Sequence, residues 1–144
     1  MTKPVIADSS ALVSLASVSD RNYNQAISLS NQLVQENRQI IIPTEVFSET
    51  VNVLGRNGSH QMAYGTANQI LSSNPIIPET TPKIRQEALT KFKNQPESVS
   101  YTDCIVMAFA DEYETREIFG FDNAFRKNGY IRFGLDKKRT ELPK

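Results

Sequence analysis

The stretch "VIADSSALVSL" (residues 5–15) changes its hydrophobic pattern in the middle, at Asp8. Before Asp8 the chain is a short apolar run that follows Pro4, as expected of a buried strand. After Asp8 the apolar residues recur at helical spacing, and Ser9 or Ser10 is expected to cap the helix. The stretch therefore predicts a strand that passes directly into a helix, with a carboxylate at the junction.

The same alternation of strand and helix continues along the chain. Further strands are predicted at residues 40–43, 74–80, 116–121 and 130–133. Helices are predicted at residues 24–37, from Thr44 to about Leu54, and at residues 59–72, 82–93 and 101–113. This order predicts an α/β protein with a three-layer, Rossmann-like fold, in which a mostly parallel central sheet carries helices on both faces.

We expect one domain over residues 1–133. The charged residues 134–144 are expected to form a C-terminal tail that is part of the domain edge or disordered. The stretch at 74–80 lies between prolines and is expected at the edge of the sheet, because proline cannot donate a ladder hydrogen bond.

The composition excludes several classes of protein. The sixteen basic and sixteen acidic residues cancel, so no global basic field indicates nucleic-acid binding, although a local patch would suffice. Cys104 is the only cysteine and His60 the only histidine, which excludes an intramolecular disulfide, a cysteine zinc cluster and a His-pair metal motif. No signal-peptide pattern and no run of about 18 apolar residues is present, so we expect a cytoplasmic protein without a membrane partner.

Four acidic residues fall where such a fold can collect them: Asp8, Glu49, Asp103 and Asp122. Parallel sheets place their sites at the carboxyl ends of the strands, and two of these acids directly follow predicted strands. Clustered carboxylates repel one another and are costly to bury, so they normally require a cation. Oxygen ligands suit Mg²⁺ or Mn²⁺, and one or two such ions would activate water for in-line displacement at phosphorus.

Three of these acids also have a purely structural interpretation. Asp8 can cap the helix that follows it, and Asp122 can begin a turn or a helix. Asp103 occupies the third helical position of the capping box "SYTD", in which Ser100 is the cap. A helix cap and a metal ligand are compatible roles at a helix N-terminus.

Glu49 competes with Glu45 for the position that faces the site. At about 100° per residue, Glu49 lies roughly 40° outside the apolar arc of its helix and Glu45 roughly 80° outside it. Glu49 is therefore expected to turn toward the core, and Glu45 toward solvent.

Two N-terminal stretches resemble motifs of the PIN domain, the metal-dependent ribonuclease fold that includes the toxins of VapBC-type toxin–antitoxin pairs. "IADSSALVSL" resembles the opening motif Asp-x-Ser/Thr-x-Leu and matches Asp8, Ser10 and Leu12. "IIPTEVFSETVNVL" is similar to the second motif, in which a strand and a proline precede a helical glutamate by six residues. That spacing selects Glu49, in agreement with the helical geometry.

Two later stretches resemble the third and fourth motifs of the same family. "SYTDCIVMAFADEY" matches an aspartate that heads an alanine-rich helix, which is Asp103. "IFGFDNAFRKNGY" is similar to Thr-x-Asp-x-x-Phe followed by a basic residue and glycine, and it matches Asp122 and Phe125. The resemblance runs from about Val5 to Tyr130, and its one departure is Gly120, where the family has Ser or Thr.

The resemblance implies a Mg²⁺- or Mn²⁺-dependent endoribonuclease in which the four acids are both the metal ligands and the catalytic residues. Ser10 and Asn123 are expected to orient these acids without contacting the metal themselves. They are also expected to compensate for the hydroxyl that Gly120 lacks. Candidate contacts to RNA phosphates are Arg56, Arg126 and Lys127. The family further implies a type II toxin with an antitoxin partner, and a homodimer.

A second hypothesis is a PIN-like fold that has lost catalysis and serves as a binding or assembly module. Gly120 and the neutral net charge favour it. A small phosphatase is a more distant alternative.

Overall fold

The computed structural model describes residues 2–137, so most of the predicted tail, residues 138–144, lies outside the described residues. The elements in chain order are β1 (Val5–Ala7), α1 (Ser9–Ala16), α2 (Tyr23–Gln35), β2 (Ile40–Ile41), α3 (Thr44–Asn57), α4 (His60–Ser72), α5 (Pro82–Phe92), α6 (Tyr101–Glu112), β3 (Glu117–Phe119), α7 (Asn123–Lys127) and β4 (Ile131–Arg132).

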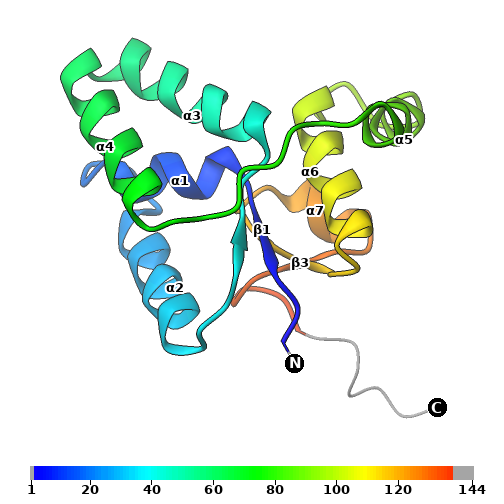
Figure 1. Cartoon of the computed structure of the whole chain (residues 1–144), viewed down its shortest axis with the longest axis horizontal. Coiled ribbons are helices and arrows are strands. Elements are labelled where there is room, and N and C mark those ends of the chain that lie inside the picture. Colours follow the sequence, from blue (N-terminus) through cyan, green and yellow to red (C-terminus); the bar gives the residue numbers. More distant parts are fainter. Residues whose placement is uncertain (1, 138–144) are drawn as a thin grey trace.

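The four strands form one sheet in the order β2-β1-β3-β4, and every neighbouring pair is parallel. Ile6 at the centre pairs with Ile41 on one side and with Ile118 on the other. Figure 1 shows α1 and α2 on one side of the strands and α5 and α6 on the other. The predicted three-layer α/β fold with a parallel sheet is confirmed.

The core lies where α6 packs on β1 and β3. Seven consecutive residues of α6, Cys104–Ala110, are buried, and all residues of β1 and β3 are buried as well. Continuous apolar runs are typical of parallel strands covered on both faces, whereas a half-exposed strand would alternate. This burial holds the N-terminus of α6 close to the carboxyl ends of the central strands.

The stretch at 74–80 forms a single bridge in place of the predicted strand. Ile76 pairs in parallel with Ile41, donating to the carbonyl of Ile40 at 3.1 Å and accepting from Ile42 at 2.8 Å. Prolines at positions 75 and 78 flank the bridge and cannot donate to a ladder, so only one residue forms a bridge, although the Pro78 carbonyl still accepts the Thr44 N–H at 3.2 Å. The expectation that this stretch lies at the sheet edge, beside β2, is correct.

Of the two alternatives for the cap of α1, Asp8 is correct and Ser9 or Ser10 is wrong. The Asp8 carboxylate accepts the Ser10 N–H, so Ser9 and Ser10 are the first helical residues. The predicted end of α3 near Leu54 is also wrong. The helix α3 continues through Gly55 to Asn57 and is capped by Gly58. A glycine inside a helix costs only about 1 kcal/mol, which packing easily overcomes. Within the described residues, no helix combines the length and apolar character needed to cross a membrane.

Candidate active site

The strand order brings the predicted acids to one end of the sheet. Asp8 follows β1 and Asp122 lies beyond β3, and these two strands are direct neighbours. The Asp8 N–H donates to the carbonyl of Phe119 at 2.9 Å, which extends the pairing to the strand ends. The helices α3 and α6, which carry Glu49 and Asp103, pack against each other, and α3 also packs against α1.

Asp8 is the buried centre of this arrangement, with a relative exposure of 3%. One carboxylate oxygen, Oδ2, accepts both the Ser10 N–H at 3.2 Å and the Ser10 hydroxyl at 2.7 Å. Burial, with the charges of Asp103 and Glu49 adding to it, raises the pKa of Asp8 to about 7, against the opposing effect of the Ser10 hydrogen bonds. Asp8 is therefore both a helix cap and a carboxylate whose charge the fold destabilises.

Ser10 connects two of the acidic segments. Its hydroxyl donates to Asp8 and accepts the N–H of Phe121 at 3.0 Å, across 111 positions of sequence. This contact holds the residue just before Asp122 against the start of α1.

Glu49 is half-buried and lies close to Asp103. Burial raises its pKa and the charge of Asp103 adds to the effect, whereas a hydrogen bond from Ser9 and the charge of Arg56 oppose it. Ser9 is a site residue that the sequence interpretation missed, because it occupies the variable position of the first motif. Two successive serines thus contact two different acids.

Glu45 differs from the expectation of a solvated side chain. It is half-buried, and both of its carboxylate oxygens lie 2.7 Å from the Thr80 hydroxyl. The segment after the Ile76 bridge therefore covers this acid, which the helical wheel of α3 alone does not reveal.

Asp103 forms the predicted capping box with Ser100. Its Oδ2 accepts the Ser100 N–H at 3.0 Å, and its own N–H donates to the Ser100 hydroxyl at 3.1 Å. Burial raises the pKa of Asp103 and the charge of Asp122 adds to this, partly offset by the Ser100 bonds. The cap thus fixes a carboxylate that also faces the other acids.

Asp122 caps α7 by accepting the Ala124 N–H at 2.9 Å. It interacts electrostatically with Asp103 and with Arg132, an arginine that no motif pointed to. Electrostatic interactions therefore link all four acids. Asp8, Glu49 and Asp103 each interact with the other two, and Asp103 also interacts with Asp122.

The remaining predicted residues lie at the periphery. The Asn123 side-chain oxygen accepts from Arg126 Nε at 3.0 Å, so this amide is engaged with a cation and not with an acid. Arg126 and Lys127 are exposed on α7, and Arg56 is exposed on α3 within electrostatic reach of Glu49.

The chemistry of this donor set suits a divalent cation, although the side chains are not arranged around one. Among residues 2–137, no group of three or more His, Cys, Asp or Glu side chains is positioned to hold a metal ion. The acids nevertheless carry the penalty that a cation relieves, since burial and mutual repulsion raise the pKa values of Asp8, Glu49 and Asp103. Carboxylate oxygens are the ligands that Mg²⁺ and Mn²⁺ prefer.

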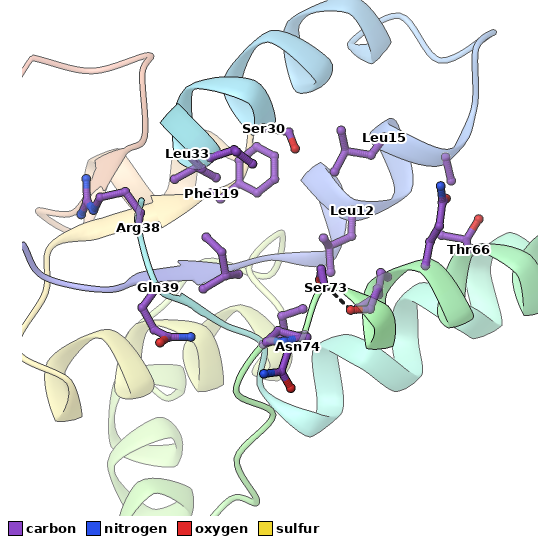
Figure 2. Close-up of a pocket in the computed structure, with 17 residues that line it drawn as sticks. Leu12, Leu15, Ser30, Leu33, Arg38, Gln39, Thr66, Ser73, Asn74 and Phe119 are labelled. Carbon is purple, nitrogen blue, oxygen red and sulfur yellow. Dashed lines mark hydrogen bonds between the residues drawn. The ribbon is translucent and has the colours of Figure 1, made fainter. Parts of the chain in front are cut away.

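A cavity of about 430 Å³ lies away from the acids, between α1, α2, β2 and α4. Figure 2 shows Leu12, Leu15 and Leu33 around it, with Arg38 toward one side. None of the four acids lines this cavity, so it is a separate feature of the fold.

Comparisons with known proteins agree with this architecture. A solved structure of VapC20 from Mycobacterium tuberculosis, described as a Sarcin-Ricin loop cleaving toxin, superimposes with a TM-score of 0.77 at 19% sequence identity. The match covers 88% of this chain and 96% of that chain. Comparison with curated protein sequences gave no match. The family model of the PIN domain matches residues 5–129, which is most of the chain, and the chain therefore belongs to the PIN domain family.

Proposed function

We propose that this chain is a Mg²⁺- or Mn²⁺-dependent endoribonuclease whose catalytic residues are Asp8, Glu49, Asp103 and Asp122. The observation that carries the proposal is the buried Asp8, whose pKa of about 7 reflects burial together with the charges of two neighbouring acids. Perturbed carboxylates gathered at the carboxyl ends of parallel strands are typical of functional sites. PIN domain membership and the likeness to VapC20, a Sarcin-Ricin loop cleaving toxin, support the choice of RNA as substrate.

The four acids would hold one or two divalent ions, which when bound supply a Lewis acid for the phosphate and lower the pKa of a water. The serines orient the acids: Ser10 holds Asp8, Ser9 contacts Glu49, and Ser100 holds Asp103. Fixed oxygens lower the cost of assembling a coordination sphere. The exposed cations Arg56, Arg126 and Lys127 would contact the RNA phosphates and keep the polyanion near the acids.

Metal binding would involve a rearrangement of side chains, since the acids are not clustered for coordination. A carboxylate has about four lone-pair sites, so the Ser9–Glu49 and Ser100–Asp103 hydrogen bonds leave others for a metal ion. We therefore expect ion binding to draw Glu49 and Asp103 toward Asp8, which is already fixed.

Partners follow from the same proposal. As a VapC-like toxin of a type II pair, the chain would bind RNA as substrate and an antitoxin as inhibitor, and it would form a homodimer. Size-exclusion chromatography with light scattering would determine the oligomeric state. Co-expression with the product of any small upstream reading frame would test for the antitoxin.

RNA cleavage by the wild type and by the variants Asp8→Asn and Glu49→Gln tests the mechanism. In Mn²⁺ we expect the wild type to cleave and both variants to lose activity by about 100-fold or more, since even changes to residues behind metal ligands cost 10–100-fold. EDTA should abolish the wild-type activity. Glu45→Gln is the matched control on the same helix, because its amide can still accept from Thr80. Cleavage by Asp8→Asn at the wild-type rate would disprove the mechanism.

The second candidate is a binding or assembly module that has lost catalysis. The absence of a coordinating cluster among residues 2–137 favours it, as does Gly120 in the fourth motif. Calorimetric titration with Mn²⁺ separates the two candidates: binding at millimolar concentration or tighter that Asp8→Asn abolishes excludes the non-catalytic module.

A further inference from the structure

The backbone of Phe121, the residue before Asp122, is held from two sides. Its N–H donates to the Ser10 hydroxyl at 3.0 Å, and its carbonyl accepts from Arg132 Nη1 at 3.0 Å. One contact comes from α1 and the other from β4, so the segment is fixed between distant parts of the chain. Asp122 directly follows this fixed peptide.

Arg132 is itself immobilised by Asp136. Its Nε and Nη2 bond to the two carboxylate oxygens of Asp136 at 3.0 and 2.9 Å, and Asp136 also accepts the Arg132 backbone N–H at 2.8 Å. Both side chains are largely buried, with relative exposures of 19% and 11%. A two-point contact of this kind orients the planar guanidinium, which leaves Nη1 directed at the Phe121 carbonyl.

Gly120 explains why the segment requires support of this kind. A Cβ atom at position 120 would lie 2.9 Å from Asp8 Cβ and 3.2 Å from Phe125 Cε2. A hydroxyl-bearing residue therefore does not fit beside the buried Asp8 without displacing it. Whatever orients Asp122 in this chain must act through the backbone or from outside the motif.

We propose that Arg132, held by Asp136, is a positioning residue for Asp122 and replaces the orienting hydroxyl that Gly120 excludes. The importance of Arg132 for catalysis rests on the proposed function. Its effect on the position of Asp122 can be measured without metal. Arg132 also places a positive charge within electrostatic reach of Asp122, at the end of the cluster opposite to Arg56.

The test compares Arg132→Lys with Arg116→Lys. Lysine keeps the charge at position 132 but cannot bond both Asp136 oxygens and the Phe121 carbonyl in one plane. Arg116 is a matched control, because its Nη2 also donates to a backbone carbonyl, that of Gly129, but at the opposite end of β3. Asp136→Asn, which weakens the contact from the other partner, is the second variant.

Amide hydrogen exchange of the metal-free protein is the first readout. The N–H groups of Phe121 and Ala124 report on the segment, since they donate to Ser10 and to Asp122. Loss of one hydrogen bond should speed their exchange about fivefold in Arg132→Lys and in Asp136→Asn, with no change in Arg116→Lys. Wild-type exchange at both amides in Arg132→Lys would overturn the positioning role.

Mn²⁺ affinity by calorimetry is the second readout. We expect Arg132→Lys to bind Mn²⁺ about tenfold more weakly than the wild type and Arg116→Lys to bind it equally well. Equal affinity of Arg132→Lys and the wild type would overturn the link between Arg132 and the site. A wild type that binds no Mn²⁺ would instead disprove the proposed function, and the exchange rates would still decide the role of Arg132.

Discussion

Asp8 combines two roles that have opposite energetic signs. As a cap it stabilises α1 by accepting the Ser10 N–H, and as a buried carboxylate near two other acids it disfavours its own charge. The balance depends on pH, because only the ionised form carries the penalty.

The first prediction concerns the pH dependence of metal-free stability. The folded-state pKa of about 7 exceeds the ordinary value of 3.8, so the folded protein binds this proton more tightly than the unfolded chain does. Stability should therefore fall as pH rises from about 4 through 7, by up to roughly 4 kcal/mol from Asp8. Urea unfolding should show Asp8→Asn to be more stable than the wild type at pH 8.

The two proteins should converge toward pH 4, where Asp8 is protonated in the folded state. Glu49 and Asp103 also have raised pKa values and should leave Asp8→Asn with a shallower slope of the same sign. A wild type and an Asp8→Asn variant with the same pH profile would contradict the burial of an ionisable Asp8.

The second prediction concerns Gly120, where space rather than backbone conformation requires glycine. Gly120→Ser restores the family's hydroxyl, yet we expect it to destabilise the protein by about 1–3 kcal/mol and to weaken Mn²⁺ binding, because its Cβ meets Asp8 and Phe125. Gly65→Ala is the control: nothing lies within 4 Å of its Cβ on α4, so it should stabilise by about 0.5–1 kcal/mol. Thermal unfolding measures both changes, and a Gly120→Ser variant with wild-type stability would refute the steric argument.

At the scale of the element, the capping box of α6 contains a residue, Asp103, that both stabilises the helix and is one of the proposed catalytic acids. Ser100 and Asp103 each satisfy a backbone N–H of the other, and the same Asp103 faces Asp122 and Glu49. Mutations can therefore remove the cap of α6 and the carboxylate of Asp103 separately.

The third prediction separates them. Ser100→Ala should lower the free energy of unfolding by about 1 kcal/mol and keep most of the RNA cleavage, because the backbone N–H at position 100 still donates to the Asp103 carboxylate. Asp103→Asn should keep the fold, because its amide oxygen can still accept from Ser100, but lose cleavage by about 100-fold or more. Unfolding curves and initial cleavage rates of the two variants provide the measurement. Wild-type cleavage by Asp103→Asn would mean that Asp103 acts only as a cap.

At the scale of the whole molecule, the two ends of the sheet have different roles. The carboxyl ends of the strands carry the acids, and the opposite end is held together by Arg38. This largely buried guanidinium bonds to the carbonyl of Lys3 at 2.7 and 3.0 Å, pairs with Glu117 and Glu36, and lies over the ring of Phe133.

The fourth prediction follows from that separation. Arg38→Met should destabilise the protein by about 3 kcal/mol, because it removes one partner of a buried ion pair. Mn²⁺ affinity, measured well below the unfolding midpoint, should not change. Arg85→Met is the control for loss of an exposed arginine and should stay within about 0.5 kcal/mol of the wild type. A weaker Mn²⁺ affinity in Arg38→Met would show that the two ends of the sheet are coupled.

Much of the fold could be predicted because its signals are local. The apolar runs that become β1 and β3, the helical spacing of α2 and α3, and the capping box of α6 each lie within a few residues of sequence. The prediction failed where tertiary contacts decide. The bridge at Ile76 ends at flanking prolines, and α3 continues through Gly55 because packing outweighs a small intrinsic cost.

By itself the sequence determined the alternation of strand and helix, the family, and the four acids with their spacing, since each is a property of contiguous residues. Only the tertiary structure decided which distant segments contact the peptides around those acids. Ser10 meets Phe121 and Arg132 meets the same peptide because β1, β3 and β4 are neighbours in one parallel sheet. Contacts between residues so far apart in sequence depend on the strand order and on the space that Gly120 leaves by lacking a Cβ. Neither can be deduced from a single motif.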